Sequence, residues 1–509
     1  MVLKCASFGI NGIDGYLVEV ESAMQTGMPV FDLVGLPDTA VKESRDRIRT
    51  AMRNCGLKLP ASHFVFNLAP ADIKKEGPVY DLPLTVNLMG LCGYIKCNIS
   101  RLAFVGEVSL GGEVRGIRGV LPMVIKAHEL GFKKIFVPQQ NAEEAAVVEG
   151  IEVYGVTNIL QLMNILNGDI VAQPARPAPR DKAQLNDFIP DFCQVKGQEE
   201  AKRAMEIAAA GGHNILLIGP PGSGKSMLAK RLPSILPDMT FEEMIETTKI
   251  HSISGKLGGR GLITTRPFRA PHHSVTAVGL GGGGTGTIRP GEVSLAHNGV
   301  LFLDELPEFS RAALEVLRQP IEDGQITISR AAQNCTYPCS ITVAAAMNPC
   351  PCGYFGDPNH HCTCTDDRIH RYLGKVSGPL LDRFDIHVEV PAVKFEELRS
   401  DETAETSAAI KERVDAARAI QQERFKGSSV NCNAKINADQ FERFCVIDDE
   451  AEQTLHTAFD SLGLTARAYD RVLKVARTIA DLEQSEIIRS DHVLEAVQYR
   501  SLDRKYWNR

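Results

Sequence analysis

A short apolar run followed by a glycine-rich loop constrains the fold of this chain more than any other feature. Residues 215–218 read Ile-Leu-Leu-Ile, residues 219–226 read Gly-Pro-Pro-Gly-Ser-Gly-Lys-Ser, and residues 227–232 are compatible with a helix. A phosphate-binding loop requires this order of strand, loop and helix. Lys225 would neutralise the β- and γ-oxygens of a bound ATP, and the Ser226 hydroxyl would ligate Mg²⁺. The expected cofactor-binding residues are Gly219, Pro220, Pro221, Gly222, Ser223, Gly224, Lys225 and Ser226.

Two further apolar runs lead to polar residues suited to the same site. Residues 300–303 precede Asp304 and Glu305, and residues 341–346 end shortly before Asn348. Open α/β sheets bind ligands at the carboxyl ends of their strands. We expect Asp304 to hold the Mg²⁺ shell, Glu305 to activate the attacking water and Asn348 to sense the γ-phosphate. Acidic residues and asparagines also end strands without any such function, so the assignments depend on the P-loop.

An arginine that follows an apolar turn is a further candidate for catalysis. It is Arg383, within residues 380–385, which read Leu-Leu-Asp-Arg-Phe-Asp. A guanidinium group is suited to stabilising charge on a phosphoryl group during its transfer. The alternative is an ordinary surface ion pair between Arg383 and Asp382 or Asp385.

Proline content and hydrophobic pattern divide the chain into four segments. Residues 173–180 contain three prolines in six positions, which favours an extended spacer within a linker at 169–184. Residues 1–168 alternate β-like and helical stretches, which indicates a mixed α/β domain. Residues 185–395 contain continuous apolar strands typical of a parallel sheet covered on both faces. Residues 396–509 carry apolar side chains at spacings of three and four, which predicts a helical lid.

Composition limits the class of protein. The chain has 509 residues and a formal charge of −7, which argues against indiscriminate coating of nucleic acid. It lacks a basic segment followed by an apolar stretch, and it has no run of about 18 apolar residues. We therefore expect a cytoplasmic protein with no membrane partner.

A local basic tract points to DNA in spite of the acidic total. Between Glu246 and Glu292 the chain contains lysines and arginines but no acidic residue, and it is rich in glycine. Such loops can grip phosphates without reading bases. The alternative is that these arginines meet acidic residues of a neighbouring subunit. The candidate DNA contacts are Lys256, Arg260, Arg266, Arg269 and, within an expected hairpin before the third strand, Arg330.

Four cysteines form two C-x-C pairs with nine residues between the pairs. Two short chelating pairs on one loop can converge on a tetrahedral Zn²⁺, although C-x-C is tighter than the usual C-x-x-C. Reduced thiols or a redox-sensitive loop are the alternatives. The expected ligands of a structural zinc are Cys350, Cys352, Cys362 and Cys364.

These motifs resemble the magnesium-chelatase-like branch of AAA+ ATPases, and within it the bacterial ComM/YifB family. The resemblance covers essentially the whole chain. It rests on residues 219–226, 299–305, 318–324, 348–353 and 380–384.

The resemblance implies roles that the residue pattern alone does not. It would make Asn348 sensor 1, Arg383 an arginine finger that acts on the neighbouring subunit's ATP, and Arg467 the sensor 2 arginine of the lid. A finger that acts in trans requires a ring, which in this family implies a homohexamer. The resemblance also implies that the basic tract is a helix-2 insertion facing the pore, and that the activity is DNA branch migration by a helicase in recombination or natural transformation.

The N-terminal segment resembles a Lon-type proteolytic domain, an α+β domain of the ribosomal S5 domain 2-like fold. The similarity lies in residues 75–81 and 106–114. Lon-type catalysis needs a serine nucleophile and a lysine base. Val79 occupies the serine position and Leu121 the lysine position, so we expect a domain without protease activity that serves oligomerisation or DNA contact.

Two functions therefore compete. The first is an ATP-driven DNA motor, which the acid-free basic tract favours. The second is a chelatase-like or chaperone-like ATPase that remodels a protein partner. An ATP-dependent protease is disfavoured by Val79 and Leu121.

Overall fold

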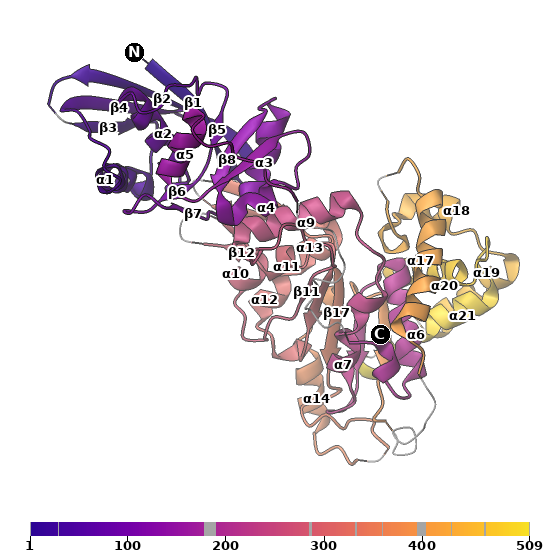
Figure 1. Cartoon of the computed structure of the whole chain (residues 1–509). Helices are drawn as coiled ribbons and strands as arrows, with labels where there is room; N and C mark the ends of the chain where they lie inside the picture. The colour runs from indigo at the N-terminus through magenta and orange to yellow at the C-terminus, as the bar shows by residue number, and fades with distance from the viewer. Residues whose placement is uncertain are drawn as a thin grey trace.

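The computed structural model describes residues 2–28, 30–177, 190–284, 288–330, 333–358, 360–393, 404–428, 430–462 and 465–507. A mixed α/β lobe, a parallel-sheet core and a group of helices follow one another along the chain (Figure 1). The N-terminal lobe lies at one end of the molecule, and the C-terminal helices flank the core. Residues 178–184 of the expected linker, and the boundary expected at residue 395, lie outside the described residues.

The core is built on a five-stranded sheet in the order β11-β14-β17-β10-β18, and all neighbouring strands in it are parallel. The expected strands at 215–218 and 300–303 are confirmed, and the third begins one residue later than expected. Because β10 lies between β17 and β18, the loop after β10 leaves the interior of the sheet. The strands are β10 (Ile215–Ile218), β11 (Phe268–Arg269), β14 (Val300–Leu303), β17 (Thr342–Met347) and β18 (Ile386–Glu389).

Both faces of this sheet are buried, which explains why its strands are apolar throughout. Ile215 and Leu217 belong to a hydrophobic core that also contains Val472 of the C-terminal helices. Leu216 and Ile218 point the other way, into a second core. Successive side chains of a strand alternate between faces, so a parallel strand covered on both sides has no polar positions.

Helices cover the sheet, and the one that follows the P-loop is shorter than expected. It was expected over 227–232, but it ends at Ala229, and a second short helix contains Pro233 in its first turn. Proline lacks an N–H and clashes with the preceding turn, so Pro233 prevents the first helix from continuing. The core helices are α6 (Glu199–Gly211), α7 (Lys225–Ala229), α8 (Leu232–Ile235), α9 (Phe241–Ser254), α10 (Ala277–Gly281), α11 (Glu292–Leu295), α12 (Arg311–Val316), α13 (Arg318–Asp323), α14 (Asp366–Leu373) and α15 (Gly378–Leu381).

Two antiparallel strand pairs are inserted between the core strands. The expected hairpin is confirmed as β15 (Gln325–Arg330) and β16 (Gln333–Pro338). Within the basic tract, β12 (Gly282–Gly283) pairs with β13 (Arg289–Pro290). Side chains of β15 lie against both glycines of β12, so the two insertions pack side by side.

The N-terminal lobe contains a mixed seven-stranded sheet in the order β3-β4-β2-β1-β5-β8-β9, with its own hydrophobic core. The short pair β6 (Glu107–Val108) and β7 (Val114–Arg115) stands apart from it. The sheet consists of β1 (Val2–Asn11), β2 (Asp14–Thr26), β3 (Phe31–Val34), β4 (Ser62–Ala69), β5 (Ala103–Phe104), β8 (Lys134–Pro138) and β9 (Glu152–Val156), and the helices are α1 (Thr39–Asn54), α2 (Asp81–Leu91), α3 (Val120–Glu129), α4 (Ala142–Ala145) and α5 (Ile159–Asn167).

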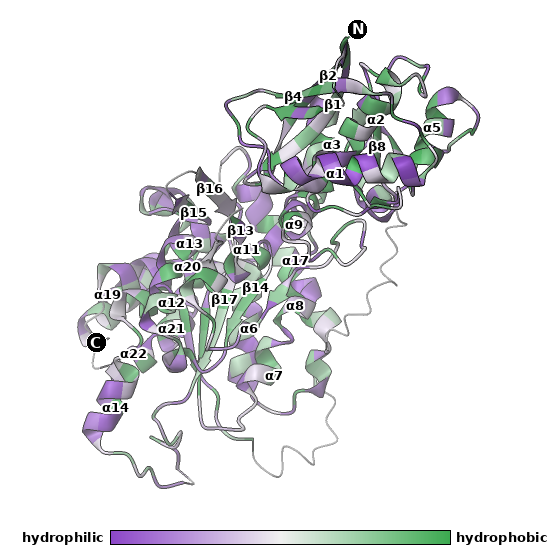
Figure 2. Cartoon of the chain, turned by 90° about the vertical axis from the view of Figure 1, so that its left-hand side faces the viewer, coloured by the Kyte–Doolittle hydropathy of each residue, from purple (hydrophilic) through white to green (hydrophobic). Residues whose placement is uncertain are grey.

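The C-terminal region is helical, as the spacing of its apolar residues predicts. The helix α21 packs against both α19 and α20, and Figure 2 shows many hydrophilic residues along α19. The helix α20 begins after Thr465, whose side chain accepts a hydrogen bond from the N–H of Ala468. The helices are α17 (Ser407–Arg424), α18 (Phe441–Phe444), α19 (Asp449–Leu462), α20 (Ala466–Leu482), α21 (Ser490–Gln498) and α22 (Ser501–Trp507).

The N-terminal lobe contacts the core through α9. The N–H of Gly119 donates to the carbonyl of Ser252 at 3.2 Å, and the Ser252 hydroxyl donates to the carboxylate of Glu144. Glu144 is buried, and burial raises its pKa. The last turn of α9 therefore anchors the lobe just before the basic tract continues.

Helix length and polarity bear on membrane association. The 18-residue α17 carries several charged side chains along its length. Within the described ranges, every helix is too short or too polar to cross a bilayer.

Candidate functional site

The P-loop leaves β10 and folds back on the side chain of Lys225. Gly222 and Gly224 have φ angles of 75° and 90°, a region that glycine adopts without a steric penalty. The Lys225 ammonium donates to the carbonyl oxygens of Gly219 at 2.8 Å and Pro220 at 2.7 Å. These contacts hold the positive charge at the centre of the loop.

The two predicted magnesium ligands lie in contact. The Ser226 hydroxyl, in the first turn of α7, donates to Oδ2 of Asp304 at 2.6 Å. Asp304 follows β14, which is separated from β10 by β17. Mg²⁺ binds oxygen ligands and usually keeps several waters beside one or two carboxylates. The pair therefore offers a hydroxyl and a carboxylate of the kind that this ion uses next to a phosphate.

The electrostatics of Lys225 fit a polyphosphate. Only 8% of this residue is exposed. Burial lowers the pKa of Lys225 to about 8, although Asp304 opposes the shift. Its direct partners are carbonyl, hydroxyl and amide oxygens, which offset the cost of a buried charge less well than an anion does. Phosphate oxygens at this position would supply the missing negative charge.

Asn348 lies between the P-loop and Asp304. It follows β17, the strand between β10 and β14. Its Oδ1 accepts a hydrogen bond from the Lys225 ammonium at 3.3 Å. The structure thus brings Lys225, Ser226, Asp304 and Asn348 into one site at the carboxyl edge of the sheet.

Glu305 projects from the same edge and is held by a histidine that the sequence analysis missed. Its side chain is 56% exposed, and Oε2 lies 3.1 Å from Nδ1 of His273. Glu305 has a φ of 53°, a conformation that is uncommon for a residue with a side chain and that recurs at functional sites. His273 follows β11 and packs against His272, with ring centroids 4.0 Å apart. The only signal in the sequence was this pair of adjacent histidines after a short strand.

Gln198 is a second residue that motif reasoning missed. Its side-chain amide donates to the carbonyl oxygens of Ser223 at 2.5 Å and Pro391 at 3.3 Å. It precedes α6, far from the P-loop in sequence. Gln198 therefore ties the P-loop to the segment after β18. No local sequence pattern marks Gln198 for this role.

Arg383 is buried against its own chain. It is 9% exposed and forms an ion pair with Glu322 in α13. Its Nε donates to the carbonyl of Arg318 at 3.2 Å, and Nη1 donates to the carbonyl of Pro379. A role in trans requires the guanidinium to exchange these partners for a neighbour's phosphate.

Arg467, the expected sensor 2 residue, lies at the start of α20. Its side chain is 67% exposed, and Nη1 lies 3.8 Å from a carboxylate oxygen of Asp382. Asp382 precedes Arg383 in sequence. The contact places Arg467 beside the segment that carries Arg383.

Two of the candidate DNA contacts share one acidic partner. Lys256 donates to Glu292 at 3.0 Å, and Arg269 donates to the same carboxylate at 2.6 Å. Burial opposes ionisation of Glu292, but the charges of Arg269 and Lys256 outweigh it and lower its pKa. Two cations around one carboxylate leave a local positive excess.

Arg266 differs from the other candidates because its side chain is only 15% exposed. Its three guanidinium nitrogens donate to the backbone carbonyls of Pro237, Asn298 and Asp238 and to the Glu243 carboxylate. These contacts tie the loop to α9 and to the turn before β14. Arg266 is therefore bound to its own chain and is not placed to contact phosphates.

Arg260 and Arg330 are exposed. Arg330 ends β15, and its guanidinium lies against Gly283 of β12. The end of the hairpin strand thus places one cation against the inserted tract. Lys256, Arg260, Arg269 and Arg330 remain the candidate contacts for phosphates.

The four cysteines of the predicted zinc site converge. Their sulfur atoms all lie within 4.8 Å of one another. The Sγ of Cys350 lies 3.3 Å from that of Cys352 and 3.7 Å from that of Cys362. Burial opposes the thiolate of Cys352, but N–H groups of Tyr354 and Thr363 outweigh it and lower its pKa to about 6. Burial raises the pKa of Cys350 to about 12 and also raises that of Cys362, so among these three only Cys352 favours the thiolate that zinc requires before a metal binds.

The N-terminal lobe places no nucleophile at the Lon-like positions. Val79 and Leu121 are both buried in the lobe. Neither side chain can attack a carbonyl or accept a proton. The N–H of Leu121 donates to Glu144 at 2.9 Å, so this position serves the contact with α9.

Family profiles match three segments of the chain. Residues 191–398 match the profile described as Magnesium chelatase, subunit ChlI, and residues 404–500 match that of its C-terminal part. Residues 20–141 match the profile described as Subunit ChlI of Mg-chelatase.

Individual proteins extend this similarity to nearly the full length. The chain is 42% identical over 495 residues to the uncharacterized protein YifB of Escherichia coli, covering 97% of this chain and 96% of YifB. It is 42% identical over 497 residues to the competence protein ComM of Haemophilus influenzae, with the same coverage. A shorter match, 30% identical over 187 residues, joins 34% of the chain to 22% of the Lon protease of Acinetobacter baumannii. The chain therefore belongs to the ComM/YifB family of magnesium-chelatase-like AAA+ proteins, with a Lon-protease-like N-terminal region.

Proposed function

We propose that the chain binds ATP with Mg²⁺ and hydrolyses it at the carboxyl edge of the core sheet. The observation that carries this proposal is the contact of Ser226 with Asp304 at 2.6 Å beside a buried Lys225. Lys225 and the loop amides bind the phosphates, and Ser226 and Asp304 hold Mg²⁺. Asn348 positions the γ-phosphate, and Glu305 orients the attacking water and draws off its proton.

Replacing Lys225 with alanine tests the binding part of this proposal. We expect ATP affinity to fall by about 30- to 150-fold, because a hydrogen bond to a charged group contributes roughly 2–3 kcal/mol. Fluorescence anisotropy of a labelled ATP measures the change. Lys230→Ala, which removes an exposed lysine at the end of α7, is the matched control and should bind as the unaltered chain does. Equal affinity in the two variants would contradict the assignment of Lys225.

The active form that we propose is a homohexameric ring. In it, Arg383 of one subunit reaches the ATP of the next, and Arg467 senses the nucleotide from the lid. In the single subunit, Arg383 is buried and paired with Glu322. This is the state of a subunit whose Arg383 does not yet contact a neighbour's ATP.

The ring acts on DNA in this proposal, as a helicase that migrates branches during recombination or natural transformation. Its support is the group of exposed or half-buried cations on the two adjacent insertions, together with membership in the family of the competence protein ComM. Aromatic side chains are scarce there, which favours contact with the phosphate backbone over stacking on bases. The alternative, remodelling of a protein partner, predicts no response to DNA.

ATP turnover with and without four-way DNA distinguishes the two functions. We expect DNA to stimulate turnover, and Arg330→Ala to weaken DNA binding at low salt and to reduce the salt slope of log K by about 0.9, the share of one phosphate contact. Lys426→Ala, which removes an exposed lysine of the lid region, is the control and should leave both quantities unchanged. Turnover that ignores DNA, with binding insensitive to salt, would favour the protein-remodelling function.

We also propose that Cys350, Cys352, Cys362 and Cys364 hold one Zn²⁺. With Zn–S bonds of about 2.3 Å, a tetrahedral ion would place its sulfurs about 3.8 Å apart. The separations of 3.3, 3.5 and 3.7 Å among Cys350, Cys352 and Cys362 are close to this value. Zinc with four thiolates has no open position for catalysis, so its role is structural.

A further inference from the structure

The loop that carries the four cysteines lies against the P-loop. Gly353 has a φ of 87°, and a Cβ built on it would fall 2.4 Å from Cδ of Pro221. The backbone of Gly353 is therefore packed directly on the Pro221 ring, with no room for a side chain. The N–H of Gly353 also donates to the carbonyl of Cys350 at 3.0 Å. The turn that brings Cys350 and Cys352 together is thus the turn that touches the ATP loop.

The same segment reaches the ATP site from its other end. Asn348 lies two residues before Cys350, and its Oδ1 contacts the Lys225 ammonium at 3.3 Å. Cys350 itself is fully buried. The position of Cys350 therefore limits where both Asn348 and Gly353 can lie relative to the P-loop.

The far side of the loop rests on the C-terminal helix α22. The rings of Phe355 and Tyr506 have centroids 6.3 Å apart, and the side chain of Lys505 lies against Gly356. Both Lys505 and Tyr506 bind the Glu389 carboxylate at the end of β18, at 2.6 Å and 3.1 Å. The loop is therefore held between the P-loop and a helix that is fixed to the strand next to β10.

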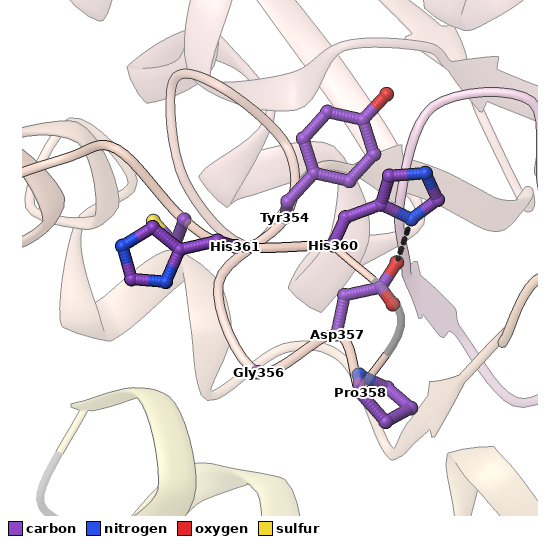
Figure 3. Close-up of a pocket in the computed structure, with 7 residues that line it drawn as sticks. Tyr354, Gly356, Asp357, Pro358, His360 and His361 are labelled. Carbon is purple, nitrogen blue, oxygen red and sulfur yellow. Dashed lines mark ion pairs between the residues drawn. The ribbon is translucent and has the colours of Figure 1, made fainter.

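Nothing in the loop itself is regular enough to hold this position. From Pro349 to Thr365, the described residues form no helix or strand. Figure 3 shows Tyr354 and His360 side by side at a pocket, with a dashed line from His360 to Asp357. Their rings are 4.8 Å apart, and the ion pair measures 3.5 Å. His361 points away from this pair, and neither histidine belongs to the four-sulfur group.

We propose that zinc bound by the four cysteines is a clamp that sets the P-loop for ATP, by fixing Gly353 against Pro221 and Asn348 beside Lys225. The proposal rests on the proposed ATP site and adds to it a dependence on the metal. Zinc held by the four sulfurs would release their remaining thiol protons to solvent, and its binding free energy would order a loop that has no helix or strand of its own. Without the ion, the turn at Cys350–Gly353 is no longer held in place. Pro221 of the P-loop then loses its packing contact with Gly353.

Metal content and ATP affinity, measured on the same full-length samples, test the clamp. We expect about one zinc per chain by elemental analysis, in keeping with one tetrathiolate group. Cys352→Ser should lose the zinc and weaken ATP binding by about tenfold or more, a typical cost of losing an orienting contact. Cys97→Ser, which alters an exposed thiol of the N-terminal lobe, should change neither quantity.

A second variant separates the clamp from simple misfolding. Gly353→Ala leaves all four cysteines in place but puts a methyl group into the Pro221 ring. We expect it to keep its zinc and its melting temperature to within a few degrees, yet to bind ATP as weakly as Cys352→Ser. Such a result would assign the effect to the contact between Gly353 and Pro221.

Each failure has a different meaning. A purified chain without zinc, or with a disulfide among these cysteines, would overturn the metal site. A zinc-free Cys352→Ser that binds ATP normally would overturn the clamp and leave the ATP site intact. Failure of the unaltered, zinc-loaded chain to bind ATP would overturn the proposed ATPase function and the clamp with it.

Discussion

Arg383→Ala should reduce ATP turnover by about 10³- to 10⁵-fold while leaving ATP affinity nearly unchanged, as expected of an arginine that stabilises charge only in the transition state. In the described chain, the guanidinium contacts Glu322 and the carbonyls of Arg318 and Pro379, which belong to α13, α15 and their flanks. An arginine held by these partners adds little to the affinity of the chain for its own ATP. Steady-state turnover and labelled-ATP binding, measured side by side, separate the two effects.

Mixed subunits test whether Arg383 acts in trans. Arg383→Ala subunits keep an intact Lys225, and Lys225→Ala subunits keep an intact Arg383. In a head-to-tail ring assembled from equal amounts of both, about a quarter of the interfaces would pair the two intact residues. We expect the mixture to recover turnover that neither variant shows alone, which also establishes that both variants fold. A mixture as inactive as its components would contradict the trans role.

Arg383→Lys and Arg45→Ala complete this test. Lysine keeps the charge but lacks the planar fork that contacts two phosphate oxygens, so Arg383→Lys should also turn over slowly. Arg45 lies on α1 of the N-terminal lobe, with its side chain about half exposed beside Asp46. Its replacement should leave turnover unchanged.

Glu305→Gln should slow hydrolysis by about 10²- to 10⁴-fold, the usual contribution of a general base, and should trap bound ATP. Glutamine keeps the size of the side chain and removes the group that accepts a proton from water. ATP affinity should stay the same, because Glu305 is separate from the contact between Ser226 and Asp304. Single-turnover hydrolysis of radiolabelled ATP measures the chemical step directly.

Glu308→Gln is the matched control for that variant. Glu308 lies three residues farther along the same edge, is 44% exposed and pairs with Lys375 at 3.2 Å. Its ion-pair partner is Lys375, which is not one of the nucleotide-site residues, so turnover should stay near that of the unaltered chain. Equal loss of activity in both variants would mean that hydrolysis depends on the total negative charge at this edge of the sheet. It would contradict a specific role for Glu305 as the base.

Sequence patterns predicted the parts of this structure that depend on residues close together in the chain. The strands at 215–218 and 300–303 were predicted correctly because burial on both faces permits only apolar residues there. The hairpin before the third strand and the amphipathic α20 follow from local patterns in the same way. The helix after the P-loop ends earlier than its composition predicts, because the ring of Pro233 clashes with the carbonyl four residues before it.

Such patterns do not predict contacts between segments that lie far apart in the sequence. The pairing of His273 with Glu305 and the bond from Gln198 to Ser223 join residues that no spacing rule relates. The contact of Gly353 with Pro221 is of the same kind. Each depends on how strands and loops stack in space, which periodicity in a single sequence does not encode.

A count of charged residues in the sequence also does not show which of them are buried. Arg266 belongs to the acid-free tract by sequence, yet its guanidinium binds backbone carbonyls inside the core. Lys256 and Arg269 share Glu292, which closes the same tract. The basic tract therefore offers fewer cations for DNA than its composition indicates. Arg330 is a stronger candidate for a DNA contact than its sequence position indicates, because it lies beside Gly283 of that tract.

Electron microscopy of the full-length chain with a non-hydrolysable ATP analogue, Mg²⁺ and four-way DNA tests the nucleotide site, the ring and the DNA role together. We predict a six-membered ring with DNA in its pore, and with each nucleotide held between Lys225 of one subunit and Arg383 of the next. A particle in which the analogue lies away from Lys225 and Asp304, or in which the subunits remain separate with ATP bound, would contradict it.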